Sequence, residues 1–113
     1  MTDTTAFIQN GATVAITANA TAPTAVQILP TFTASLPPRN QYRIVNAGTV
    51  TLFLGTGPTA AIAATNAAAV TTTGNAIPVV ANGVEILTFP PTWFFTATAA
   101  SAATLYITPG EGL

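Results

Sequence analysis

The feature of this sequence that most limits its fold is a series of short runs in which apolar and small polar residues alternate. In the run 12–18, Val14 and Ile16 alternate with Thr13 and Thr17. Such alternation places one set of side chains on each face of an extended strand, whereas a surface helix needs a period of about 3.6 residues. The pattern recurs at 24–29, 41–46, 49–55, 84–89, 92–98 and 104–108, with shorter candidates at 5–9 and 77–80.

Turn-forming residues separate these runs. Asn10-Gly11 and Asn82-Gly83 favour type I′ turns, because both residue types tolerate positive φ. Asn46-Ala47-Gly48 is typical of a hairpin loop with glycine in the left-handed region, and Pro37-Pro38 and Pro90-Pro91 interrupt strand pairing. Together these features predict one all-β domain, an antiparallel β-sandwich that is jelly-roll-like and has seven to nine short strands.

The Ala-rich segment 60–70 is the one stretch with a helix-like composition. It lacks a long apolar stripe, and it leads into Thr71-Thr72-Thr73-Gly74, whose β-branched residues have low helix propensity. We therefore expect a long loop with at most one helical turn in this segment.

The alternation also predicts which residues fill the core. Trp93, Phe94 and Phe95 are consecutive and cannot share one face of a strand, so we place Phe94 inside and the other two on the opposite face. We expect the sandwich to span residues 11–113, preceded at 1–10 by an N-terminal arm or an edge strand. The expected core residues are Val14, Ile16, Ile44, Leu52, Ile86, Phe94 and Leu105.

Charged residues are nearly absent. They make up 4% of the 113 residues and comprise Arg39, Arg43, Asp3, Glu85 and Glu111. An almost neutral surface favours association, so we expect a homo-oligomer, either a dimer or a trimer. Two arginines are too few to hold nucleic acid by its phosphates. We expect them to form solvated or intersubunit ion pairs with Glu85 or Glu111.

The composition removes most enzyme chemistry. His, Cys and Lys do not occur, which excludes the commonest general base and the thiolate and Schiff-base nucleophiles. The three acids are scattered, and the glycine-rich segment 55–60 lacks the Lys-Ser/Thr ending of a phosphate loop. We expect no catalytic activity, cofactor or metal. No apolar run is long enough to span a membrane, and the N-terminus lacks the basic region of a secretion signal.

Four apolar residues are candidates for partner binding. Phe7 and Ile8 would anchor an N-terminal arm on a neighbouring subunit, or would form a short edge strand on the chain's own sheet. Trp93 and Phe95 would present an aromatic surface to a partner, or would pack within the domain.

The second half of the chain contains the runs 43–49, 51–55, 77–79 and 84–87 and the ending 103–113, which closes on Thr108-Pro109-Gly110-Glu111-Gly112-Leu113. Through these runs, roughly residues 41–113 resemble the short virion proteins of tailed bacteriophages. The resemblance implies a capsid decoration, or cement, protein. Such proteins fold as β-sandwiches or jelly rolls, oligomerise, and bridge neighbouring subunits of the major capsid protein on the virion exterior, after assembly in the host cytoplasm. The resemblance implies no catalytic residues and no cofactor.

Two other functions fit the same pattern. A phage tail or fibre module, with a receptor-binding or structural role, would also be rich in short Thr-rich strands. A carbohydrate-binding sandwich would need exposed aromatic residues in a groove and a route of secretion. We expect the capsid role, because a fibre module normally shows repeats and the N-terminus here shows no secretion signal.

Overall fold

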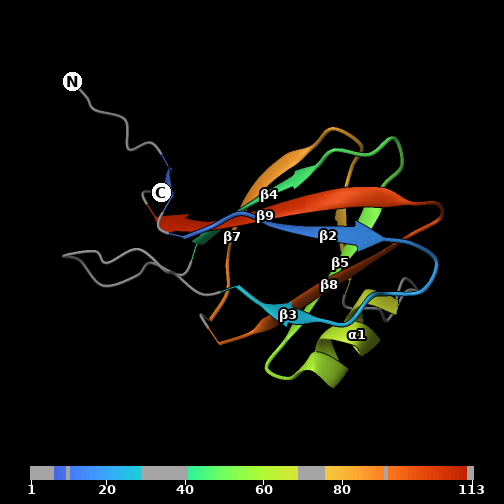
Figure 1. Cartoon of the computed structure of the whole chain (residues 1–113), viewed down its shortest axis with the longest axis horizontal. Helices are drawn as coiled ribbons and strands as arrows, with labels where there is room; N and C mark the ends of the chain where they lie inside the picture. Colours follow the sequence, from blue (N-terminus) through green and yellow to red (C-terminus); the bar gives the residue numbers. More distant parts are fainter. Residues whose placement is uncertain (1–6, 10, 29–40, 69–75, 91, 112–113) are drawn as a thin grey trace.

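The computed structural model describes residues 7–9, 11–28, 41–68, 76–90 and 92–111, which form two antiparallel β-sheets packed face to face (Figure 1). This arrangement confirms the predicted β-sandwich. Sheet A contains β1 (Ile8–Gln9), β2 (Val14–Ala18), β4 (Gln41–Asn46), β7 (Val84–Thr88) and β9 (Ala103–Glu111). Sheet B contains β3 (Val26–Gln27), β5 (Leu52–Gly57), β6 (Ile77–Val79) and β8 (Phe94–Ala99), and a helix, α1 (Ala60–Ala68), follows β5.

Strand β9 is the middle of sheet A. One of its edges pairs with β4, which in turn pairs with β7, and its other edge pairs with both β2 and β1. Residues paired across strands lie on the same face, so Ile16, Leu105 and Ile107 point into the sandwich while their neighbour Tyr106 points outward. The sequence alternation thus separates a core face from an outer face over residues 103–107 of this strand.

The chain changes sheet at most of its connections, and this corrects the predicted turns. The segment 46–48 leads from β4 in sheet A to β5 in sheet B, so it is not a hairpin loop. At the link from β6 to β7 the Gly83 N–H donates to the Val80 carbonyl at 2.8 Å, and among described non-glycine residues only Asn82 has positive φ, at 61°. One left-handed residue at the third position is the pattern of a type II turn, not type I′. Asn10 lies outside the described residues.

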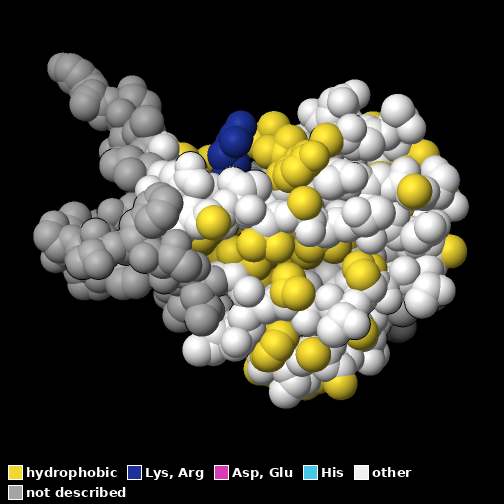
Figure 2. Space-filling view, viewed as in Figure 1, with side chains coloured by type: hydrophobic (Ala, Val, Ile, Leu, Met, Phe, Trp, Pro, Cys, Tyr) yellow, Lys and Arg dark blue, Asp and Glu magenta, His cyan; other side chains and the backbone are white. Residues whose placement is uncertain are grey.

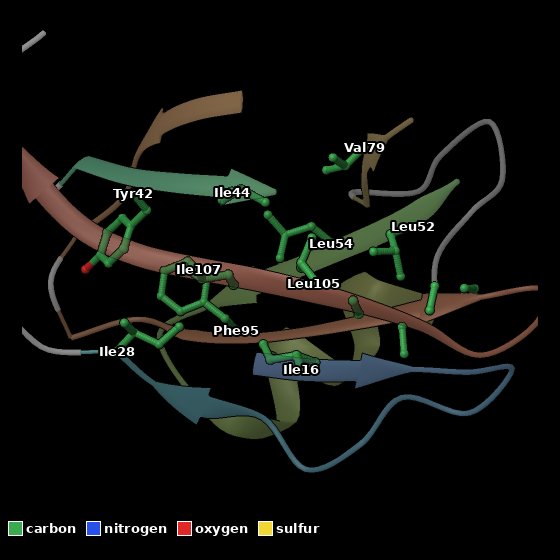
Figure 3. Close-up of a cluster of buried hydrophobic side chains, with 14 residues drawn as sticks. Ile16, Ile28, Tyr42, Ile44, Leu52, Leu54, Val79, Phe95, Leu105 and Ile107 are labelled. Carbon is green, nitrogen blue, oxygen red and sulfur yellow. The ribbon is translucent and has the colours of Figure 1, made fainter. Parts of the chain in front are cut away.

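The core lies between the two sheets, and its large side chains come from both of them (Figure 3). Four predicted core residues, Ile16, Ile44, Leu52 and Leu105, are confirmed, and Val14 packs against the cluster. The predictions for Ile86 and Phe94 are wrong, because their strands face the opposite way. Leu87 packs against the core from β7, and Phe95 is fully buried from β8. The remaining members of the cluster are Ala18, Ile28, Tyr42, Leu54, Val79, Ala97, Ala99, Ala103 and Ile107.

The Ala-rich segment is a helix, so the predicted loop is wrong. Helix α1 begins after Thr59, whose hydroxyl accepts the Ile62 N–H at 3.2 Å as an N-cap. The helix lies on the outer face of sheet B, where glycine provides the room. A methyl group at Gly55 would overlap Ala63 O and Ala67 N, so the helix backbone fits only against a bare strand. Because α1 contacts sheet B through small residues, the helix packs there without a broad apolar stripe.

Two side-chain hydrogen bonds fasten this helix to the sheet beneath it. The Asn66 Nδ2 donates to the Thr56 carbonyl at 2.7 Å, and the Thr98 hydroxyl donates to the Ala67 carbonyl at 2.8 Å. The second bond satisfies a carbonyl in the last turn of the helix, which has no partner within the helix itself. Within the described part of the chain, no helix has the length and hydropathy to cross a membrane.

Candidate interaction surface

The two sheets differ in what covers their outer faces. Sheet B carries α1, whereas no described segment lies over the outer face of sheet A (Figure 1). Large apolar side chains consequently stay in contact with solvent on sheet A: Tyr106 is 40% exposed and Val84 is 51% exposed. An exposed set of apolar residues on one face of a small domain is typical of a protein contact.

These residues form a continuous row. Ala15 pairs with Tyr106, Tyr106 with Val45, and Val45 with Val84, so the row crosses β2, β9, β4 and β7 in sequence. The half-buried Ile86 lies one row away, opposite Arg43. Figure 2 shows hydrophobic side chains gathered beside a basic group on this side of the molecule. We call the outer face defined by these five apolar residues and Arg43 the sheet A surface.

The aromatic residues predicted to face a partner lie elsewhere. Phe95 is fully buried and meets Phe89 edge to face, with ring centroids 5.5 Å apart and planes at 80°. Of the two alternatives for Phe95, the structure shows packing within the domain. The half-buried Trp93 stacks on Phe89, with ring centroids 6.3 Å apart and ring planes at 26°. Phe94 is half-buried and lies opposite Gly57, on the outer face of sheet B.

The N-terminal candidates belong to the chain's own sheet. Strand β1 pairs with β9 through Ile8↔Glu111 and Gln9↔Gly110. For Ile8 and Gln9 the structure shows the edge strand, and residues 1–6 lie outside the described part of the chain. Phe7 is half-buried just before this strand. A role for Phe7 and Ile8 in partner binding stays a prediction.

A bulge separates β1 from β2 along the same edge of β9. Gln9 pairs with Gly110 and Val14 pairs with Ile107. Between these two pairs the chain advances five residues from β1 to β2 but only three along β9, so the edge contains two extra residues. Bulges of this kind redirect side chains and frequently occur beside binding sites.

A cavity of about 300 Å³ opens on the outer face of sheet A at this bulge. Its lining residues are Phe7, Gln9, Thr13, Arg43 and Thr108. The hydroxyls of Thr13 and Thr108 share a hydrogen bond of 2.7 Å, and the Gln9 Nε2 donates to the Gly11 carbonyl at 2.6 Å. The cavity thus combines one aromatic ring with several polar groups whose positions are fixed by neighbouring backbone and side chains.

The carboxylate of Glu85 does not lie beside the cation of this cavity. Arg43 pairs with Ile86, whereas Glu85 pairs with the buried Ile44 and so lies on the opposite face of the strand pair. Arg43 and Glu85 therefore do not pair within one chain, and the predicted pair between subunits stays a prediction. Arg39 lies outside the described residues. Sequence reasoning singled out Arg43 but not Thr13 or Thr108, because their meeting depends on the register of β2, β4 and β9.

The described residues hold no group of three or more acidic, His or Cys side chains that could bind a metal ion. What the sheet A surface does offer is hydrophobic contact, hydrogen bonding by hydroxyl and amide groups, and one positive charge. Comparison of the chain with protein-family models, with curated proteins and with solved structures gave no match in any of the three.

Proposed function

We propose that this protein is a structural virion protein that decorates the capsid shell of a tailed bacteriophage and stabilises it by bridging capsid subunits. The sheet A surface is the observation that carries the proposal. The domain covers one sheet with a helix and leaves an apolar row exposed on the other, and such a row supports the proposal of a contact with a protein partner.

The scarcity of charge supports the same function. With 4% charged residues, the protein gains little from electrostatic repulsion between copies and makes most of its contacts through apolar and neutral polar groups. A shell offers the same contact many times, so a modest affinity at each site gives strong overall attachment when the protein is an oligomer. No catalytic step is part of the proposed function.

The test is binding to purified shells of the phage whose genome encodes the chain. We expect the wild-type protein to cosediment with shells at a fixed copy number per capsid subunit and to raise the temperature at which the shells rupture. The Tyr106→Glu variant should lose binding, because it places a charge in the centre of the apolar row.

The matched control is Ile62→Glu, which adds the same charge at a residue of similar exposure, 43%, on helix α1. This variant should bind shells as the wild type does. A wild-type protein that is found in the tail of purified particles, or that leaves shells undecorated, would contradict the proposal. Equal loss of binding in both variants would contradict the assignment to the sheet A surface.

A further inference from the structure

The cavity at the bulge between β1 and β2 has the groups needed to hold an anion. We propose that it is a binding site for a carboxylate group carried on a short apolar stem, with Arg43 as the cation. The inference rests on the geometry of the cavity and not on the proposed capsid function.

Arg43 is placed to act as a fixed anchor. It lies in β4, whose two edges are paired with β9 and β7, so the backbone that carries the guanidinium is held on both sides. The side chain is exposed and, among described residues, makes no ion pair or side-chain hydrogen bond. A guanidinium offers a fork of N–H donors that matches the two oxygens of a carboxylate.

The neighbouring polar groups add donors. In the pair formed by Thr13 and Thr108, one hydroxyl donates to the other, and the accepting hydroxyl keeps its own proton for another partner. The Gln9 Nε2 uses one proton on the Gly11 carbonyl and retains a second. These donors lie in the wall of one cavity with Arg43 and, like the guanidinium, favour an oxygen ligand.

The charge and the apolar wall narrow the class of ligand. One guanidinium balances a single negative charge, which suits a carboxylate better than a phosphate dianion. The ring of Phe7 lines the same cavity and favours an aliphatic stem next to the anion. A volume of about 300 Å³ is at the small end of ligand cavities, so the cavity is large enough for a side chain or a chain terminus.

The experiment uses the full chain and butyrate as the probe, with binding followed by NMR shifts of backbone amides. We expect saturable shifts at Arg43, Thr108 and Thr13, and none with butyramide, which has the same shape without the charge. Arg43→Gln should abolish the shifts, and Arg43→Lys should weaken binding by about tenfold, because lysine cannot form the paired contact. The amide spectra without ligand show that each variant is folded.

Glu85→Gln is the matched control, since it also changes the net charge by one but lies on the opposite face of the strand pair. This variant should bind butyrate as the wild type does. Phe7→Ala should weaken butyrate more than acetate, because only butyrate has a stem to contact the ring.

Two further probes distinguish the sources of the carboxylate. N-acetylglutamate α-methylamide presents a side-chain carboxylate, and N-acetylalanine presents a chain-terminal one; tighter binding of either identifies the source and supports the site. Tighter binding of methyl phosphate than of butyrate would overturn the carboxylate assignment. Shifts that persist unchanged in Arg43→Gln would overturn the site itself. Neither result bears on the proposed capsid function, because this experiment contains no capsid shells.

Discussion

The side chain of Asn46 joins the two sheets through the interior by donating a hydrogen bond of 2.9 Å to the Val79 carbonyl. Asn46 ends β4 in sheet A, and Val79 ends β6 in sheet B. Its second amide proton goes to the Val50 carbonyl at 2.8 Å, and its Oδ1 accepts the Gly48 N–H at 2.8 Å. A fully buried amide with both protons used therefore fixes the crossing between the layers.

The first prediction concerns this amide. Asn46→Leu should lower the free energy of unfolding by roughly 2–4 kcal/mol, because it leaves the Val79 and Val50 carbonyls without their donor. Urea denaturation followed by the fluorescence of Trp93, the single tryptophan, measures the change. Asn19→Ala is the control: its exposed side chain bonds only to the adjacent Ala20 N–H, and the loss should stay within about 0.5 kcal/mol.

The second prediction tests how the helix fits on sheet B. Gly55→Ala should cost roughly 1–3 kcal/mol of stability, because the added methyl overlaps backbone atoms of α1 that cannot rotate away. Gly57→Ala should cost less, because its methyl stays 3.1 Å from the nearest helix backbone atom, Ala63 N, and its one severe overlap is with Cγ2 of Ile62, at 2.5 Å. Thermal unfolding of the two variants compares them directly, and equal losses would contradict this packing account.

The third prediction concerns the hydroxyl of Tyr42. The ring packs against Phe95, with centroids 4.9 Å apart, but the buried hydroxyl has no hydrogen-bond partner among the described residues. Removal of an unpaired buried polar group avoids its desolvation cost. Tyr42→Phe should therefore leave the free energy of unfolding unchanged or raise it by about 1 kcal/mol, as measured by urea denaturation at pH 7. A clear loss of stability would show that the hydroxyl has a partner.

The fourth prediction follows from the same group at high pH. Desolvation by burial raises the pKa of Tyr42 above its ordinary value of 10.0. Above that pH the unfolded state loses the phenolic proton while the folded state keeps it, so the unfolded state binds fewer protons and stability falls as pH rises. The contribution is fully present below pH 10.0 and is lost as pH passes through the raised pKa.

Denaturation at pH 9 and pH 11 gives the readout for this effect. The wild type should lose stability between the two, and Tyr42→Phe should lose less. Tyr106→Phe, which removes a phenol from an exposed position on sheet A, serves as the control. A loss that is the same in wild type and Tyr42→Phe would contradict the role of burial.

The strands could be predicted from the sequence, but two of their faces could not. Sequence alternation identifies the core face of a strand only where apolar and polar residues alternate. Trp93, Phe94 and Phe95 are three consecutive aromatic residues, so the pattern does not show which of them faces the core. The choice of Phe95 for the core comes from its packing against Phe89 and against Tyr42, which lies far away in the sequence. The helix was missed for a related reason, since its fit depends on glycine in a different element.

The cavity around Arg43 could likewise be predicted from the sequence only in part. Arg43 stands out in a sequence with two basic residues, so its candidacy needs no structure. The cavity around it depends on two extra residues in one strand relative to another, and on which threonines then meet. Such register is set by the pairing of segments almost a hundred residues apart, which local patterns do not encode.

The central place of β9 in sheet A has a consequence for how the protein is made. Every other strand of that sheet except β7 pairs directly with residues 103–111, which leave the ribosome after all the other described strands. Contacts this distant along the chain close slowly, and until then β2 has no partner strand and β4 can pair only with β7. Sheet B has all its strands once Ala99 has emerged, whereas sheet A assembles only after synthesis has passed Glu111.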